Sequence, residues 1–356
     1  MPAGPRPDAS ELVVDREILV CCGPGGVGKT TVAAALAVEG ARRGRRTVVV
    51  TIDPAKRLAD ALGLDTLTDT AHRIDGDWPG ELWALMLDPR STFDGLVTRY
   101  APEPGQAEAI LANRFYRNIS GALSGTQEYM AMEKLFELHN DERFDLVVVD
   151  TPPTRNALDF VDAPRRLTRL LDNRLFRLLM MPARTGFRAV NLATQAFLRT
   201  IGKVVGSEVV SDAVTFFQAF EGMEDGFRQR AQGVQVLLAD PCTAFLLVTS
   251  PRRDAARETE FFAQKLGEAG IDVEALIVNR MHPRFPPVGA GEAPVPALAS
   301  LYRNLCDLSR LADGEEAHVA ALADRVGAPA VRVPELETDV HDLPGLSRVA
   351  DYVFAS

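Results

Sequence analysis

The 356-residue sequence is poor in cysteine, and this limits the metal and redox chemistry that it can support. Its four cysteines form no C-x-x-C pair, so the chain offers neither a zinc clasp nor a dithiol redox motif. Cys21 and Cys22 are adjacent in an apolar run, whereas Cys242 and Cys306 are isolated. We expect reduced thiols and a cytoplasmic location.

Long apolar runs are also missing. No stretch approaches the roughly 18 apolar residues that a membrane span needs, and the N-terminus, MPAGPRPDAS, lacks the apolar centre of a signal peptide. The net charge of −10 argues against the electrostatic footprint of a nucleic-acid-binding protein. With 46% apolar and 25% charged residues, the chain has the composition of an ordinary globular protein with a sizeable core.

Short apolar runs recur along the chain, and helical patterns separate them. Most runs are continuously apolar, which is typical of strands buried on both faces of a parallel sheet. The runs span residues 17–22, 47–53, 81–88, 144–150, 244–250, 275–280 and 330–336. We therefore predict a doubly wound, mostly parallel α/β sheet that binds its ligand at the carboxyl ends of the strands.

The spacing of these runs predicts how the chain is divided. Residues 1–14 read as a disordered tail, and residues 15–356 as one α/β domain. The long interval after Asp150 carries helix formers and no strong strand signal, so we predict a helical insertion at about 160–235. A further helical stretch is expected at about 90–140.

The segment 23-GPGGVGKT-30 fits the pattern G-x-x-x-x-G-K-[ST]. An apolar run precedes it and a helical pattern follows, which is the context that a phosphate-binding loop requires. The glycines let successive backbone N–H groups turn toward phosphate oxygens, and the helix N-terminus adds free amides. Lys29 would neutralise the β- and γ-phosphates, and the Thr30 hydroxyl would hold Mg²⁺.

Two aspartates follow predicted strands. Asp150 ends the run 146-LVVVD-150 and precedes a stiff Thr151-Pro152-Pro153 turn. It is either the second carboxylate of the Mg²⁺ site, bound directly or through water, or a simple helix cap. Asp53 is followed by Pro54, so it either orients the attacking water or only caps the next helix. The residues alone leave both alternatives open for Asp53.

Four segments together resemble a known family. GPGGVGKTT, TIDPAKRLADALG, VVVDTPPTRNALDFV and LIVNRM, in this order, resemble the arsenical-pump ATPases, and the likeness extends over roughly residues 15–350. A eukaryotic branch of that family guides tail-anchored proteins to membranes. The resemblance implies a P-loop ATPase domain that uses ATP and Mg²⁺ and works as a dimer, either of this chain or with a related ATPase.

The resemblance also assigns roles to individual residues. It implies that Asp53 and Lys29 are catalytic, with Asp53 orienting water, and that Thr30 and Asp150 belong to the Mg²⁺ site. Asn279 would read the adenine edge, since an amide both donates and accepts hydrogen bonds. The full set expected to bind nucleotide is Gly25, Gly26, Val27, Gly28, Lys29, Thr30, Thr31, Asn279, Arg280, Pro334 and Glu335.

The sequence departs from the family at several positions. The family's signature lysine, which reaches a partner's phosphates, is Pro24 here, and proline has neither charge nor N–H. Lys56, where the family usually has histidine, either replaces that charge or is simply solvated. Arg252 either faces a dimer interface or lies in an exposed loop. The zinc C-x-x-C and the arsenite-binding cysteine cluster of the two branches are both absent.

The predicted insertion has an amphipathic segment. Residues 165–188 carry seven arginines and leucines spaced by three and four. They either line a nucleotide-gated groove for an apolar protein client or membrane partner, or pack on each other. We therefore expect a Mg²⁺-dependent ATPase that switches a helical subdomain. The alternatives are a weakly hydrolysing regulatory subunit that works with a lysine-bearing paralogue, and a holdase-like binding module.

Overall fold

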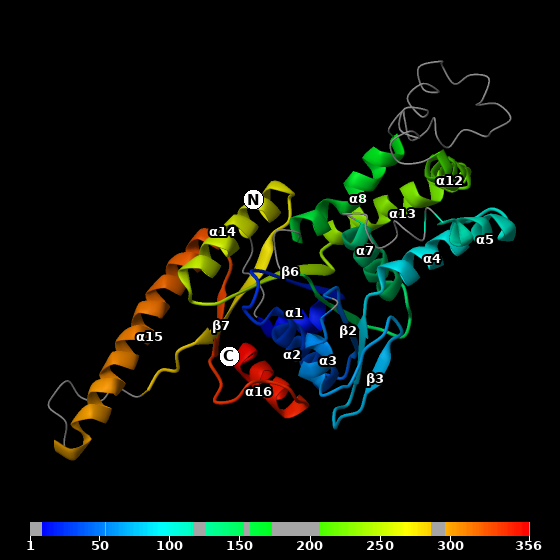
Figure 1. The fold of residues 1–356 in the computed structure, drawn as a ribbon. Coiled ribbons are helices and arrows are strands. Elements are labelled where there is room, and N and C mark those ends of the chain that lie inside the picture. The colour runs from blue at the N-terminus through cyan, green and yellow to red at the C-terminus, as the bar shows by residue number, and fades with distance from the viewer. Residues whose placement is uncertain are drawn as a thin grey trace. The chain divides into compact units, whose positions relative to one another are not determined.

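The structure is a computed structural model, and it describes residues 9–53, 55–114, 116, 126–152, 157–172, 207–285 and 296–355 (Figure 1). Contacts within the chain divide it into two compact units. The first unit comprises Met1–Met86, Leu138–Leu158 and Ala239–Ser356, and the second comprises Leu87–Glu137 and Asp159–Leu238. The described residues include no helix with both the length and the apolar character required to cross a membrane.

The first unit is built on an eight-stranded sheet with the order β3-β4-β2-β5-β1-β6-β7-β8. Every neighbouring pair is parallel except β3 and β4. The strands are β1 (Ile18–Cys22), β2 (Arg46–Thr51), β3 (His72–Ile74), β4 (Glu81–Met86), β5 (Leu146–Asp150), β6 (Thr243–Thr249), β7 (Val273–Met281) and β8 (Ala330–Pro334). The predicted fold class, a mostly parallel α/β sheet, is confirmed.

Strand β3 is the one that the sequence did not indicate. It has three residues, of which only Ile74 is buried, and it pairs antiparallel with β4 at the edge of the sheet. A short, polar edge strand carries no continuous apolar run, so periodicity gives no signal for it. The central strands β1, β5 and β6 are buried along their whole length, which explains why their apolar runs were easy to recognise.

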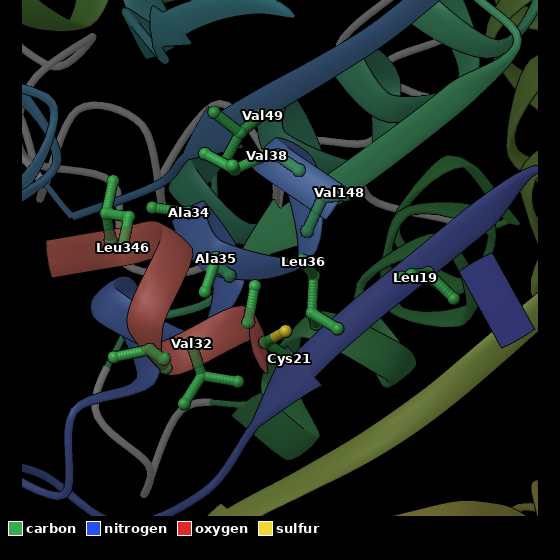
Figure 2. Close-up of a cluster of buried hydrophobic side chains, with 14 of the residues drawn as sticks. Leu19, Cys21, Val32, Ala34, Ala35, Leu36, Val38, Val49, Val148 and Leu346 are labelled. Atoms are coloured by element: carbon green, nitrogen blue, oxygen red, sulfur yellow. The ribbon is translucent and has the colours of Figure 1, made fainter. Parts of the chain in front are cut away.

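Helix α2 (Lys29–Arg42) anchors the loop that precedes it. Alanines 33, 34, 35 and 37 on this helix are completely buried, and such small side chains let the helix approach the sheet closely. Figure 2 shows Val32, Leu36 and Val38 of α2 in one cluster with Val49 of β2 and Val148 of β5. The other helices of this unit are α1 (Ala9–Asp15), α3 (Arg57–Leu62), α14 (Arg253–Glu268), η1 (Pro296–Leu298), α15 (Ala299–Val326) and α16 (Leu343–Val353).

The predicted disordered tail is wrong for residues 9–14, which belong to helix α1. Leu12 is 2% exposed and Val13 is fully buried, and both join the core cluster around α2. The Val13 carbonyl also accepts a 2.7 Å hydrogen bond from the Arg45 guanidinium. Burial of this apolar pair holds a helix that local sequence alone would leave disordered. Residues 1–8 lie outside the described part of the chain.

The anchoring of α1 can be tested directly. Leu12→Ala should lower the free energy of unfolding by about 2–5 kcal/mol, because it removes a buried side chain and leaves a cavity. The control is Val14→Ala, since Val14 is 51% exposed on the same helix and should change stability by about 0.5 kcal/mol or less. Denaturant unfolding of both variants measures this difference. Equal stability of the two variants would show that α1 is not part of the core.

The described residues of the second unit are mainly helical and have a core of their own. It contains a group of packed aromatic rings: Phe216 stacks on Tyr116 at 5.8 Å between ring centroids and contacts Phe220 at 4.9 Å. The helices are α4 (Pro89–Tyr100), α5 (Pro104–Ala112), α7 (Thr126–His139), α8 (Ala157–Asp172), α12 (Ser207–Gln218) and α13 (Glu224–Ala239). Helices α7 and α13 end in the first unit, and α8 begins there. Residues 173–206 of the expected insertion, including most of its apolar set, lie outside the described residues.

Candidate active site

The predicted catalytic and metal-site residues lie at the carboxyl ends of three adjacent strands in the first unit. The glycine-rich loop follows β1, Asp53 follows β2, and Asp150 is the last residue of β5. In the sheet register, Asp150 lies beside Cys21 on one neighbour and beside Thr51 on the other. The parallel arrangement thus gathers residues that are about 100 positions apart in the sequence.

The loop has the backbone conformation that only glycine adopts readily. Gly26 and Gly28 have φ angles of 76° and 92°. A Cβ atom on Gly28 would also lie 2.3 Å from Asn279 Nδ2, so a side chain there would displace the Asn279 amide as well as strain the backbone. Gly28 caps α2 without any side-chain hydrogen bond to the first turn. The amides at this helix N-terminus are therefore suited to bind an anion.

Lys29 is held inside the loop. Its side chain is 6% exposed, and Nζ donates a 2.9 Å hydrogen bond to the Pro24 carbonyl. Burial lowers the pKa of Lys29, while the nearby Asp150 carboxylate opposes this effect. An ammonium group has three donors, so the bond to Pro24 leaves Nζ able to donate to a ligand as well.

Asp150 has one satisfied and one unsatisfied carboxylate oxygen. The residue is 1% exposed, and Oδ2 accepts hydrogen bonds from Thr30 Oγ1 at 2.8 Å and Thr51 Oγ1 at 2.9 Å. Among the residues that the structure describes, Oδ1 has no hydrogen-bond partner. Burial raises the pKa of Asp150 to about 6, against the lowering effects of the two hydroxyls and Lys29. A buried carboxylate oxygen beside a threonine hydroxyl fits a hard divalent cation such as Mg²⁺.

Asp53 joins the same network through Thr51. Its backbone N–H donates to Thr51 Oγ1 at 3.2 Å. The carboxylate accepts a 3.0 Å hydrogen bond from Ala55 N on Oδ1, and Oδ2 lies 3.2 Å from Arg57 Nη1. Asp53 therefore caps the following turn while lying near Asp150 and Lys29. Arg57 was missed by sequence reasoning, although its position four residues after Asp53 is a recognisable ion-pair spacing.

The end of β7 holds the loop from the other side. Asn279 is 8% exposed, and its Nδ2 donates to the Val27 carbonyl at 2.9 Å, while its Oδ1 accepts from Arg280 N at 2.9 Å. Arg280 has a left-handed φ of 61°, and its Nη1 donates to the Gly26 carbonyl at 3.1 Å. Both residues contact the loop backbone, and the Asn279 amide keeps one N–H and one lone pair for a ligand.

A cavity of about 350 Å³ borders the loop. Arg252 lies there, exposed, with its Nη2 2.7 Å from Asp254 Oδ2, so the charge of Arg252 has a partner. Lys56 is exposed at the start of α3 and does not line the cavity. The lining residues include Pro24, Gly25, Gly26, Val27, Arg252, Arg280, Glu335 and the pair His282 and Glu315, which sequence reasoning missed. Pro334 ends β8 just before Glu335.

Comparison with known proteins agrees with this geometry. The family model described as Anion-transporting ATPase matches residues 16–286. ATPase GET3 of Malassezia globosa is 26% identical over 289 residues, which cover 80% of this chain and 79% of the relative. ATPase asna-1 of Caenorhabditis elegans is 25% identical over 352 residues, covering 92% and 90% of the two chains. The chain therefore belongs to the anion-transporting ATPase family, and the resemblance inferred from its motifs is confirmed.

Proposed function

We propose that this chain is a Mg²⁺-dependent ATPase that hydrolyses ATP at its glycine-rich loop. The observation that carries the proposal is the arrangement at Asp150, where one buried oxygen accepts from Thr30 and Thr51 and the other has no partner among the described residues. Membership of an ATPase family supports the same activity. Hydrolysis needs charge neutralisation around the phosphates, which Lys29 and a Mg²⁺ ion held at Thr30 and Asp150 would supply.

Each residue has a role in the proposal. The loop amides from Gly25 to Thr31 and the Lys29 ammonium bind the phosphates. Thr30 and Asp150 hold Mg²⁺, directly or through water, and the ion when bound neutralises negative charge on the phosphates. Asp53 orients the attacking water. The adenine side of the site consists of Asn279, Arg280, Pro334 and Glu335.

The cap made by Asp53 does not oppose its catalytic role. Arg57 is 60% exposed, and an exposed ion pair contributes only about 0–1 kcal/mol. The carboxylate of Asp53 can therefore leave Arg57 at little cost when a substrate water is present. The bond from Ala55 N uses Oδ1 alone, so Oδ2 remains available to accept a proton or a hydrogen bond.

Pro24 favours a second candidate function. In place of the family's lysine it offers only a carbonyl, which accepts from Lys29 of its own loop. A weakly hydrolysing subunit that needs a lysine-bearing paralogue is consistent with this position. Under this alternative the partner supplies the missing charge within a heterodimer, whereas the main proposal works as a homodimer.

The second unit is our candidate for the part that responds to nucleotide. We propose that hydrolysis in the cytoplasm switches this unit and thereby its hold on an apolar client or membrane partner. The seven arginines and the leucines of residues 165–188 support an amphipathic surface. Phe216, Phe217 and Phe220 do not support it, since they pack in the core of the unit. In the alternative of a holdase-like module, the same unit binds the client, and this binding does not depend on ATP hydrolysis.

Phosphate release by the purified protein tests the proposal. Hydrolysis should require Mg²⁺ and stop when the metal is chelated. Thr30→Ala should raise the Mg²⁺ concentration for half-maximal hydrolysis by about 10–100-fold, because it removes an oxygen from the metal site. Thr98→Ala, which removes a hydroxyl bonded to the Asp94 carbonyl in α4, is the control and should behave as wild type. Equal Mg²⁺ dependence of Thr30→Ala and wild type would contradict the assignment of the metal site.

A further inference from the structure

Three side chains of the first unit form a group that the ATPase site does not use. Glu17, His139 and Cys242 each offer a ligand atom, and these atoms all lie within 4.8 Å of one another. Glu17 directly precedes β1, Cys242 directly precedes β6, and His139 is the last residue of α7. The group thus lies at the amino ends of β1 and β6, whereas the glycine-rich loop follows the carboxyl end of β1.

The backbone holds two of the three residues in place. Glu17 N and Ile18 N both donate to the Cys242 carbonyl, at 2.9 Å and 3.1 Å. Cys242 N in turn donates to Asp240 Oδ1 at 2.8 Å, which fixes the turn before β6. The approach of Glu17 to Cys242 is therefore a property of the sheet and does not depend on a chance contact between side chains.

The spacing of the side chains suits a tetrahedral metal site. His139 Nδ1 lies 3.4 Å from Glu17 Oε2. Two bonds of about 2.1 Å that meet at a tetrahedral angle place their ligand atoms about 3.4 Å apart, and a longer bond to sulfur raises this to about 3.6 Å. Because the three ligand atoms already lie within 4.8 Å of one another, the Cys242 sulfur needs to move by little more than 1 Å to reach this spacing. The Glu17 side chain is 55% exposed and can rotate to complete the geometry.

There is room for an ion and a water molecule beside two of these side chains, Glu17 and His139. A cavity of about 350 Å³ is lined by Glu17 and His139 together with Arg45, Phe144, Asp145 and Val147. The Arg45 guanidinium is held by hydrogen bonds to the backbone carbonyls of Val13, Arg16 and Asp145. The carboxylates of Asp145 and Glu17 lie near enough to offset its positive charge. Asp145 pairs with Arg46 at 2.6 Å.

The donor atoms determine the class of ion. A thiolate, an imidazole and a carboxylate together favour zinc and its close analogues over Mg²⁺ and Ca²⁺, which prefer oxygen ligands. We propose that Glu17, His139 and Cys242 bind a zinc-class divalent cation, with water as the fourth ligand. Coordination replaces the thiol proton of Cys242 by the metal, and the proton passes to the buffer. The ion ties the amino ends of β1 and β6 to the end of α7, independently of the ATPase activity.

Cobalt(II) added to the full-length, chelator-treated protein without nucleotide is the test. Cobalt bound by a thiolate absorbs in the near ultraviolet, whereas cobalt bound by oxygen ligands near Asp150 does not produce this band. We expect one equivalent of cobalt to produce the band in wild type and Cys242→Ser to abolish it. Glu17→Gln and His139→Gln should each weaken cobalt binding by about tenfold or more.

Cys306→Ser is the matched control, because Cys306 is similarly half-buried and should leave cobalt binding unchanged. The proposal is overturned if wild type shows no thiolate band, or if the band survives in Cys242→Ser. It is also overturned if His139→Gln binds cobalt within about twofold of wild type, since the thiol would then act alone. Glu17 is exposed and His139 is partly exposed, so these two variants keep the test decisive if Cys242→Ser folds poorly.

Discussion

Asp150→Asn should slow ATP hydrolysis by about a hundred- to a thousandfold and yet make the ligand-free protein more stable at pH 8. The loss of activity follows from removing the carboxylate that we place beside Mg²⁺. The asparagine oxygen still accepts from Thr30 and Thr51, which donate to Asp150 Oδ2 in wild type. The fold is therefore kept while the negative charge is lost.

The gain in stability follows from the pKa of Asp150, which burial raises from the ordinary 3.8 to about 6. Because the folded protein binds this proton more tightly than the unfolded chain, the contribution to stability is fully present below about pH 4. It is lost as the pH rises through about 6. At pH 8 the ionised, buried carboxylate costs about 3 kcal/mol relative to a neutral group. The neutral amide of the Asp150→Asn variant would avoid this cost, and thermal unfolding without nucleotide measures the difference.

Asp145→Asn provides a control of opposite sign. The Arg46 guanidinium lowers the pKa of Asp145, so this carboxylate stabilises the fold above its unfolded pKa and loses that effect as pH falls. The pair is exposed, and its removal should lower stability at pH 8 by about 1 kcal/mol or less. An Asp150→Asn variant that is less stable than wild type at pH 8, or that hydrolyses ATP at the wild-type rate, would contradict this account.

Asp53→Asn should lower kcat by about a hundredfold or more while leaving nucleotide affinity nearly unchanged. Helix α3 begins only at Arg57, so Asp53 closes the turn before it. Asparagine forms the same side-chain turn as aspartate, so it preserves the bond from Ala55 N to the side-chain oxygen at this position. It removes only the negative charge that would orient and accept from the attacking water. The substitution thus separates the two roles that the sequence left open for Asp53. Single-turnover hydrolysis and equilibrium binding of ATP measure them independently.

The neighbouring ion pair supplies the control for Asp53. Arg57→Ala removes the exposed partner of Asp53 and should leave kcat within about threefold of wild type or raise it slightly. If Asp53→Asn hydrolyses ATP at the wild-type rate, Asp53 is only a cap. If Arg57→Ala is as slow as Asp53→Asn, the guanidinium itself is needed, and the role given to Asp53 alone is wrong.

Sequence reasoning found the parts of the site that depend on local pattern. The glycine loop with Lys29 and Thr30 follows from the spacing of its motif, and the parallel sheet brings Asp53 and Asp150 to the same edge because each ends an apolar run. Arg57 also follows a local rule, the four-residue spacing of an ion pair with Asp53, but sequence reasoning did not identify it. The fold class was predictable for the same reason, since the buried strands are continuously apolar.

The other features that sequence reasoning missed depend on tertiary contacts. His282 follows the end of β7, and Glu315 lies on α15. The distance from His282 Nδ1 to Glu315 Oε1 is 2.8 Å although the two residues are 33 positions apart. No short motif encodes that pairing. Among the described side chains of helix α1, the buried apolar ones are Leu12 and Val13. A seven-residue segment with these two positions gives no clear helical periodicity in the sequence. The group formed by Glu17, His139 and Cys242 is spread over three distant segments and likewise shows no spacing signal.

Single-turnover hydrolysis tests the central claim most directly. Purified chain in excess over ATP should release phosphate without any other protein, and only when Mg²⁺ is present. Lys29→Ala should release none on the same timescale, because it lacks the ammonium that we place beside the phosphates of ATP. Phosphate release by wild type only after a lysine-bearing relative is added, or equal release by wild type and Lys29→Ala, would contradict the claim that this chain hydrolyses ATP at its own loop.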